Sequence, residues 1–446
     1  MALWIPWFRC VSQLRPACAR HRTFLWMMVA LLGFSVRAEL AGVTTFVRAA
    51  FLRPALYRRL LHLFHTPALR LEALTSLWIR LLPRLFRPLR VHGRLVLVGD
   101  GLKVGKEGRK MPAVKKLHQE SADNSKPEFI FGHSFQALGM LVRGPRGHVS
   151  CVPVTSRIHE GLVFSNAHRR TLLDKFVQLF LLVAAPLEGP LLLLADAFFA
   201  TGKVLRPLLH DGHHLLTRVR STAVAYELPP QPAKRRRGRP RLYGAKVRLR
   251  DLWARTEPFR AAPSPVYGEK GIEIRYLAVD LLWRPVGQLV RFVLVEHPSR
   301  GHLILMTSDR SLEPLDVLAL YGLRFKIEVG FKQAIHTLGT YAYHFWMQDM
   351  VPLARKSGNQ YLHRKSEAYR AQVRRKMDAY HRYVQLGCIA QGIQQHLALR
   401  SPSKVWGSFR SWMRTMKPGH PPSEAVVAQA LRNTLPEFLI AAPEDQ

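Results

Sequence analysis

Apolar residues recur at two spacings along the chain, and each spacing predicts a different kind of structure. In residues 1–90 they recur every three or four positions, most regularly over residues 46–63 and 69–82, which is the period of a helix. Pro83 stands where the second run should end, because proline disfavours continuation of a helix. We expect a basic helical region here, with a plain helical bundle as the simpler alternative to a helix-turn-helix.

Short β-rich runs replace the helical period after residue 90. The run RLVLVGDG begins at Arg94, and its Asp100 stands between Gly99 and Gly101. Two glycines would let the backbone turn sharply, so we expect this strand to end at Asp100 and to leave the carboxylate at the strand end. A polar loop should follow at residues 103–126. Three further strands are then predicted, at residues 129–135, 138–143 and 148–158.

A helix, a buried strand and a second carboxylate come next. The helix is expected over residues 166–185. Residues 191–195, LLLLA, form a continuous apolar run, as in a strand buried on both faces. The run ends at Asp196, where another helix begins. With a further strand at residues 214–220, the order is that of an α/β sheet in which Asp100 and Asp196 close separate strands.

Between residues 221 and 310 a β-rich insertion interrupts this order. Three strands are predicted in it, at residues 272–283, 288–296 and 303–307, the first two forming a hairpin. Before them lies a basic run, KRRRGRPR, with the composition of a loop. Its Arg237 and Arg239 belong to an Arg-Gly-Arg-Pro sequence that resembles a short element found in narrow A·T-rich minor grooves. A solvated basic loop is the alternative, and either interpretation places positive charge near a phosphate backbone.

One polar face stands out on the helix expected over residues 315–338. At the helical repeat, Tyr321, Arg324, Glu328 and Lys332 fall within about 80° of one another. A carboxylate with an arginine four residues before it and a lysine four residues after it suits an acidic metal ligand near phosphates. A ladder of surface ion pairs is the alternative, and such pairs contribute only a few tenths of a kcal/mol each.

The remaining sequence predicts packing rather than chemistry. We interpret the aromatic run YAYHFW, residues 341–346, as core packing. One or two long helices are expected over residues 366–399. From residue 401 onward the sequence indicates no chemistry.

The charge of the chain predicts its partner. Lys and Arg number 67 against 30 Asp and Glu among 446 residues, a formal charge of +37. A compact protein with such a surplus would repel itself unless a polyanion is its usual partner, and nucleic acid is the default. The hydrophobic fraction of 48% excludes a disordered basic tail. The four cysteines form no C-x-x-C pair, so neither a disulfide scaffold nor a zinc ribbon is supported and a reducing cytosolic compartment fits.

Two apolar stretches resemble targeting or membrane segments. Residues 24–34 follow a basic stretch, as in a signal peptide, but the leading segment is long and contains two tryptophans, which disfavours secretion. Residues 176–200 are divided by Glu188-Gly189-Pro190, whereas a membrane span needs about 20 predominantly apolar residues in a row. We therefore expect no membrane partner.

Three carboxylates on separate elements suggest a metal centre. Asp100, Asp196 and Glu328 could together bind two divalent ions, because Mg²⁺ prefers a few hard oxygen ligands with water and substrate phosphates. Two such ions, about 3.5 to 4 Å apart, activate a nucleophile and stabilise the departing oxygen in a displacement at phosphorus. Spacing alone does not show that the three side chains converge.

The motifs resemble those of bacterial insertion-sequence transposases of the DDE superfamily, in the group with the signature Y-x₂-R-x₃-E-x₆-K. The resemblance rests on GDGLKVGKEGRKMP, LLLLADAFF, GRPRLYG, LLWRPVG and YGLRFKIEVGFKQAI, which together span most of the chain. Tyr321, Arg324 and Glu328 match the signature. Its lysine should stand at position 335, which is Ile335 here, and Lys332 lies about 60° away on the same helix face, where it could supply the charge.

The resemblance implies an α/β, RNase H-like catalytic core with a β-rich insertion, flanked by helical regions at both ends. Residues 1–90 would be a basic helical DNA-binding domain, and residues 91–220 the first part of the core with Asp100 and Asp196. The remaining parts would be the insertion at 221–310, the second part of the core at 311–346 with Glu328, and a C-terminal helical region at 347–446 that serves dimerisation.

The resemblance also implies roles for single residues. Asp100, Asp196 and Glu328 would be the catalytic and metal-binding triad, with Mg²⁺ as the ion and Mn²⁺ as an alternative. Tyr321 and Arg324 would hold phosphates of the element end. In relatives that cut through a DNA hairpin, a tryptophan of the insertion receives a flipped base by stacking. Trp283 is the candidate for this role, with a buried core tryptophan as the alternative.

The function implied is a transposase that cuts double-stranded DNA at the ends of its own element and joins the 3′ ends to target DNA. It would act as a homodimer in the bacterial cytoplasm, associated with the nucleoid. Two alternatives remain open: a catalytically silent DNA-binding descendant, and an RNase H-like nuclease without strand transfer.

Overall fold

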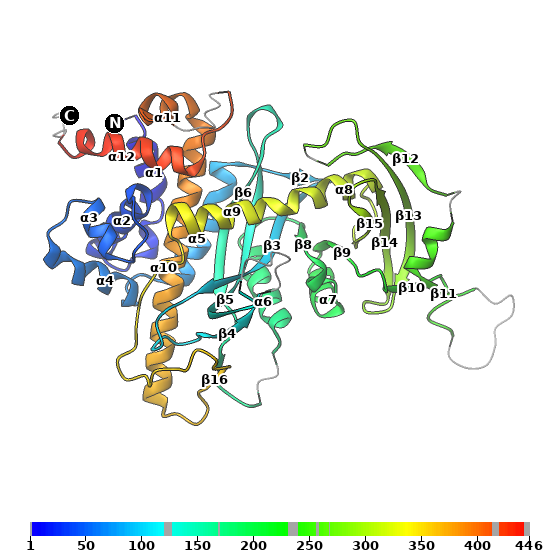
Figure 1. Ribbon diagram of the computed structural model, residues 1–446, viewed down its shortest axis with the longest axis horizontal. Coiled ribbons are helices and arrows are strands. Elements are labelled where there is room, and N and C mark those ends of the chain that lie inside the picture. Colours follow the sequence, from blue (N-terminus) through cyan, green and yellow to red (C-terminus); the bar gives the residue numbers. More distant parts are fainter. Residues whose placement is uncertain are drawn as a thin grey trace.

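The computed structural model describes residues 2–119, 127–167, 170–230, 240–255, 258–266, 268–412 and 419–440. Helices from both ends of the chain lie together at one side of the molecule, a sheet occupies the middle, and the same sheet continues into a second β-rich part at the far side (Figure 1). The α-helices are α1 (Trp4–Ser12), α2 (His21–Val36), α3 (Thr44–Ala49), α4 (Tyr57–His65), α5 (Leu71–Leu85), α6 (Leu172–Ala184), α7 (Gly202–His210), α8 (Pro314–Gly322), α9 (Lys326–Gln333), α10 (Glu367–Arg400), α11 (Pro402–Phe409) and α12 (Glu424–Ile440).

Five strands form the middle of the sheet, in the order β6-β5-β3-β8-β9. They are β3 (Arg94–Gly105), β5 (Phe129–Arg143), β6 (Val149–Ile158), β8 (Leu191–Ala195) and β9 (His214–Arg218). β5 is antiparallel to both of its neighbours in this order, β6 and β3, whereas β3, β8 and β9 are mutually parallel. Three antiparallel strands followed by two parallel strands, with helices between them, form an RNase H-like core. The predicted fold class is therefore confirmed.

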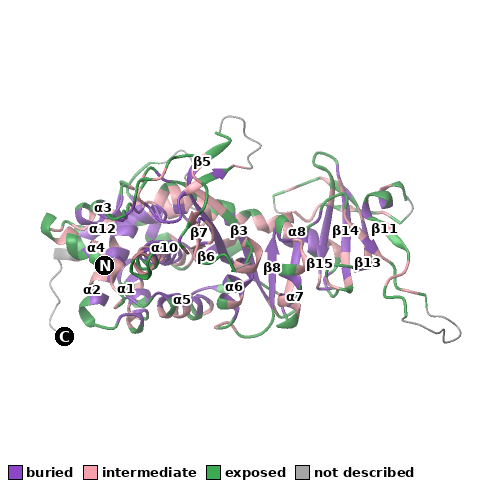
Figure 2. Ribbon diagram, turned by 90° about the horizontal axis from the view of Figure 1, so that it is seen from below, coloured by how far each residue is buried: buried purple, intermediate pink, exposed green. Residues whose placement is uncertain are grey.

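Alternation along the parallel strands divides the core into two layers, because successive side chains point to opposite faces. Leu95 and Leu97 of β3 face α6, in the same cluster as Phe176 and Phe180. Their neighbours, such as Val98, face the other way and pack with residues of α8 and α9. The strands of this layer are among the most buried parts of the molecule (Figure 2).

The insertion extends the same sheet. Its strands are β10 (Val224–Tyr226), β11 (Lys246–Arg248), β12 (Arg260–Pro263), β13 (Glu273–Trp283), β14 (Gln288–His297) and β15 (Gly301–Thr307). β15 pairs antiparallel with β9, which joins the insertion to the core. The predicted hairpin is confirmed as β13 and β14, whose turn is closed by the backbone N–H groups of Val286 and Gly287 donating to the Trp283 carbonyl.

The terminal helices share one hydrophobic core, which runs from Leu3 to Leu435. The long helix α10 lies at its centre, and its Tyr383 packs against aromatic rings of the N-terminal helices, including Phe34 and Phe64. The stretch that resembled a signal peptide is the greater part of α2, which is buried in this core. Within the described residues, no helix is long and apolar enough to cross a membrane.

Four local predictions away from the cleft differ from the structure. Residues 129–143 form one strand, β5, where two were expected, because a bulge between Leu138 and Gly139 keeps the strand paired on both sides. The helix expected from residue 166 begins at Leu172, where a Thr171–Asp174 capping box fixes its start. Residues 46–63 are split into two helices around Pro54, and α5 continues two residues past Pro83.

Candidate active site

Asp100 lies inside strand β3, five residues before its end, and pairs with Ala137 of β5. The prediction that the strand ends at this aspartate was wrong, because Gly99 serves packing and does not form a turn. A Cβ atom at position 99 would come within 2.5 Å of the Phe176 ring of α6, so glycine is required here for close helix packing rather than for a turn. The strand therefore passes through the site and carries the carboxylate on its exposed stretch.

Asp196 directly follows β8 and caps a short 3₁₀ turn, where its carboxylate accepts a hydrogen bond of 3.0 Å from the Phe198 backbone N–H. The strand pairing brings it to Asp100. Val98 of β3 stands opposite Leu194 of the parallel strand β8, and each aspartate comes two residues later. Two residues restore the same face of a strand, so both aspartates lie on the layer that α8 and α9 cover.

Glu328 reaches the same region from α9, which is held on the sheet by the buried neighbour Ile327. Arg324 joins the carboxylates. Its guanidinium donates to Asp100 Oδ2 at 3.1 Å and to Glu328 Oε1 at 2.8 Å. The surface ladder that the helix pattern allowed is therefore only half present, because Arg324 also pairs with the partly buried Asp100 of the sheet.

The charges of the site oppose one another. The pKa of Asp100 is raised to about 6, chiefly by burial; Arg324 and the Gly101 backbone N–H oppose this rise, and the charges of Asp196 and Glu328 add to it. The three carboxylates are thus close enough to repel one another, and Arg324 is the cation that compensates them. An arrangement of this kind favours a stronger positive charge at the same place.

The carboxylates open onto a cleft of about 790 Å³ that also has a basic wall. The wall includes Lys103 of β3 together with Lys115, Lys116 and His118 of β4 (Lys115–His118). Sequence reasoning placed these residues in an irregular loop and gave them no role. The alternation of Lys116, Leu117 and His118, in which only the leucine is buried, is the signal that could have indicated a strand.

The two remaining signature positions are Tyr321 and the position of the expected lysine, Ile335. Tyr321 is partly buried next to Arg324, and burial raises the pKa of its hydroxyl. Lys332 is exposed and is not among the residues that line the cleft, whereas Ile335 is. The apolar side chain therefore stands where the signature would place an ammonium group.

Trp283 is not among the residues that line the cleft. Trp283 is only 6% exposed and belongs to the hydrophobic core. Arg237 and Arg239 lie outside the described residues.

In the part of the chain that the structure describes, no three His, Cys, Asp or Glu side chains are close enough to hold a metal ion. The three carboxylates still fit a divalent ion, because they supply hard oxygen ligands. One of them, Asp100, is only 17% exposed, so its negative charge needs a nearby positive charge. The Arg324 guanidinium bridges two of the three carboxylates, Asp100 and Glu328.

Comparison with known families identifies the family of this protein. The sequence pattern of the DDE superfamily endonucleases matches residues 14–264, which is more than half of the chain. The chain belongs to this family. A comparison with curated proteins gave no match.

Membership of the DDE superfamily endonucleases indicates nuclease or transposase activity with DNA as the substrate. Enzymes of this superfamily generally use divalent metals, in keeping with the carboxylates of the cleft. The matched residues include Asp100 and Asp196, whereas Glu328 lies beyond them, so its assignment rests on its position in the cleft.

Proposed function

We propose that this DDE superfamily endonuclease is a transposase of the Y-x₂-R-x₃-E-x₆-K group, which cuts DNA at the ends of its own insertion sequence and joins the 3′ ends to target DNA. One observation carries the proposal. Asp100, Asp196 and Glu328 come from β3, from the end of β8 and from α9, and all three line one cleft with a basic wall. That combination suits phosphoryl transfer on a polyanion.

Asp100, Asp196 and Glu328 would hold two Mg²⁺ ions, or Mn²⁺ in their place. Bound there, the ions would activate the attacking oxygen and stabilise the leaving one. Arg324 keeps the carboxylates at one site before loading. Once it is released from Asp100, its planar guanidinium is suited to a phosphate of the DNA end, next to Tyr321.

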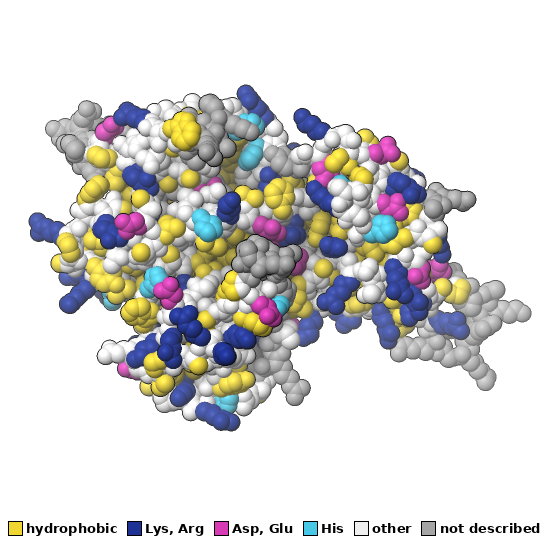
Figure 3. Space-filling view, viewed as in Figure 1, with side chains coloured by type: hydrophobic (Ala, Val, Ile, Leu, Met, Phe, Trp, Pro, Cys, Tyr) yellow, Lys and Arg dark blue, Asp and Glu magenta, His cyan; other side chains and the backbone are white. Residues whose placement is uncertain are grey.

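DNA would lie along the basic side of the cleft. Lys103 and Lys116 are placed to contact phosphates, and the excess positive charge of the chain would steer the duplex toward the molecule. Arg237 and Arg239 would add minor-groove contacts. Lys and Arg also gather around the start of α10 and over β10 and β11 on the face drawn in Figure 3. Trp283 would have to leave its core packing to receive a base.

The domain roles remain part of the proposal. Residues 1–90 would bind the element end, and residues 347–446 would carry a homodimer contact so that two ends are handled together. A bacterial cell would hold such an enzyme in the cytoplasm at the nucleoid.

Ile335 favours one alternative function. Without an ammonium group at this position the cleft loses a contact to a phosphate of the DNA end, which would weaken the binding of that end beside the carboxylates. Such a loss would harm cutting, which needs the DNA end in the cleft, more than binding through the rest of the basic surface. It is therefore compatible with a DNA-binding descendant that no longer cuts.

The test is a cutting and joining assay on purified protein. Labelled duplex DNA from one element end is incubated with Mg²⁺ and a supercoiled target plasmid, and cut and joined products are separated. Asp100→Asn and Glu328→Gln are compared with Glu313→Gln, which removes a carboxylate just before α8, outside the residues that line the cleft. We expect wild type and Glu313→Gln to yield both products, and the two cleft variants to yield neither.

Each other outcome selects a different function. Cutting without joined product would leave a nuclease and remove strand transfer. Binding with no Mg²⁺-dependent cutting, equal in wild type and both cleft variants, would leave the silent DNA-binding descendant.

A further inference from the structure

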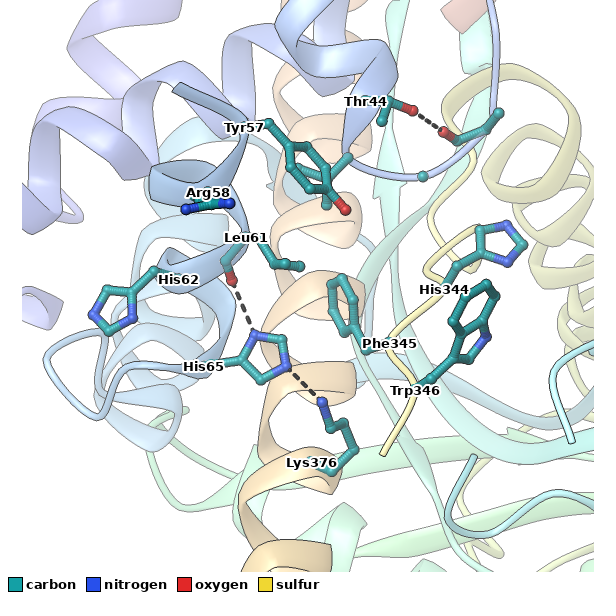
Figure 4. A pocket seen from close by; sticks show the side chains of 13 residues that line it. Thr44, Tyr57, Arg58, Leu61, His62, His65, His344, Phe345, Trp346 and Lys376 are labelled. Carbon is teal, nitrogen blue, oxygen red and sulfur yellow. Dashed lines mark hydrogen bonds between the residues drawn. The ribbon is translucent and has the colours of Figure 1, made fainter. Parts of the chain in front are cut away.

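A second cavity, of about 660 Å³, lies among the helices of the N-terminal region and has no role in the proposed reaction. Its walls come from α4, from α10 and from the segment that follows Gly339 (Figure 4). The lining is basic and aromatic: Tyr57, Arg58, His62, His65, His344, Phe345, Trp346 and Lys376. No Asp or Glu occurs among the described residues that line it.

Lys376 is held in place by a histidine. The Leu61 carbonyl can only accept, so the 2.9 Å contact fixes the proton of His65 on Nδ1. The other ring nitrogen, Nε2, then accepts from the Lys376 ammonium at 3.1 Å. Burial lowers the pKa of His65, which keeps the ring neutral and able to accept. Of the three ammonium protons of Lys376, only this one has a hydrogen-bond partner identified within the described chain, so the group is available to an anion.

Aromatic rings face the cavity from two sides. Tyr57 of α4 points toward the space in front of Phe345, and Trp346 lies on the opposite side (Figure 4). The run YAYHFW was interpreted as core packing, and this holds for Tyr343 and Phe345, which are buried. Trp346 is instead 62% exposed, an unusual exposure for so large an apolar ring.

The aromatic wall is fixed to the catalytic strand. Lys106, just past the end of β3, donates to the carbonyls of Tyr341 and Tyr343. The Met347 backbone N–H donates to the Lys110 carbonyl at 2.9 Å, and the Lys110 ammonium donates to the Gln348 carbonyl at 3.1 Å. The wall is therefore attached to the same strand that carries Asp100.

We propose that this cavity binds an unpaired nucleotide of a DNA strand, with the base on Trp346 and Tyr57 and a phosphate on Lys376. Single strands are bound by stacking on aromatic rings combined with cationic groups, as here. A cavity of this size can take one nucleotide. A duplex keeps its bases stacked on one another and could use the cations but not the rings.

The probe is a fluorescent tetranucleotide of thymidines, measured by anisotropy in EDTA so that no cutting occurs. A second tetramer, with the same phosphates but no bases, serves as the matched ligand. Trp346→Ala is compared with Trp412→Ala, which removes another exposed tryptophan elsewhere. Lys376→Gln is compared with Arg375→Gln, the exposed neighbour on α10 that does not line the cavity.

We expect the base-free tetramer to bind wild type at least about fivefold more weakly, and Trp346→Ala to lose a similar factor for the thymidine tetramer. Trp412→Ala should bind as wild type, and Trp346→Phe should retain most of the affinity. Lys376→Gln should reduce the dependence of log affinity on log salt by about 0.7, whereas Arg375→Gln should change it less.

Equal binding of the two tetramers, or equal affinities for Trp346→Ala and Trp412→Ala, would overturn the proposal. Either result concerns binding without metal, so the cutting and joining proposed for the carboxylate cleft would be unaffected.

Discussion

Arg324 shows how a single residue can stabilise an acidic site before any cation arrives. It compensates a carboxylate that is 17% exposed and one that is 54% exposed, and these would otherwise repel each other across the cleft. The price of this arrangement is that a divalent ion must compete with the guanidinium for Asp100.

Replacing this arginine should make the stability of the protein depend on Mg²⁺. Without divalent ions we expect Arg324→Gln to lose about 1–2 kcal/mol of unfolding free energy, because Asp100 and Glu328 then face each other uncompensated. Added Mg²⁺ should restore most of the loss, as followed by urea unfolding. Arg291→Gln is the matched control, since Arg291 is equally exposed and pairs twice with Asp280 of the insertion. An equal response of both variants to Mg²⁺ would contradict this role of Arg324.

Position 335 should accept the missing lysine of the signature. We expect Ile335→Lys to bind element-end duplex severalfold more tightly, with a salt dependence steeper by about 0.9, because one more phosphate would be neutralised. His336→Lys adds the same charge at an exposed neighbour that does not line the cleft. The salt dependence is measured by fluorescence anisotropy. Identical slopes for the two variants would contradict a phosphate contact at position 335.

At this scale the sequence predicted the acidic residues but not their counter-ion. Asp196 could be placed because an apolar strand ends just before it, and Glu328 because of its neighbours on a helix. The contact from Arg324 to Asp100 spans more than two hundred residues and depends on how α9 crosses the sheet, which no local pattern encodes.

Strand β3 shows that an element can be correctly predicted while its end is not. Glycine at positions 99 and 101 suggested a turn, whereas the strand continues to Gly105 because β5 stays paired with it as far as that residue. Strand β8 was predicted accurately, since a fully apolar run admits few alternatives. The basic wall was missed because β4 is only four residues long and three of them are Lys or His, so its composition resembles that of a polar loop although it pairs antiparallel with the next strand, β5.

The packing role of Gly99 can be tested directly. Gly99→Ala places a methyl group against the Phe176 ring and should lower the unfolding free energy by roughly 1–3 kcal/mol. Gly101→Ala, whose new Cβ would meet nothing closer than 3.8 Å, should change it much less. Urea unfolding of both variants measures the difference. A larger loss for Gly101→Ala would mean that the second glycine, not the first, carries the constraint.

On the scale of the whole molecule, the parts are joined by a common core rather than separated by linkers. His133 of β5 is an example, because it connects the sheet to the segments around Tyr343 and Pro112. It is completely buried, accepts from the Tyr343 hydroxyl at 2.6 Å and donates to the Pro112 carbonyl at 2.8 Å. One hydrophobic cluster therefore contains residues from several of the predicted regions.

Acid should destabilise the fold through this histidine. The pKa of His133 is lowered to about 3, mainly by burial and also by the charge of Lys106, whereas the unfolded chain takes up the proton near pH 6.5. Between these values the unfolded state binds more protons, so stability falls with falling pH by about 1.4 kcal/mol per unit for this residue. His381, also buried with a lowered pKa, adds to the trend. His133→Gln should reduce the slope of unfolding free energy between pH 6 and pH 4 by that amount. An unchanged slope would exclude His133 as the source.

The central claim is that Asp100, Asp196 and Glu328 act as one unit. The most direct test is single-turnover cutting of element-end DNA in Mg²⁺ by the three single carboxamide variants and by the double variant Asp100→Asn/Glu328→Gln. We predict that each single change lowers the rate at least about a thousandfold and that the double change lowers it little further, because groups that act together are not additive. Loss of less than tenfold in any single variant, or losses that multiply in the double variant, would contradict the claim.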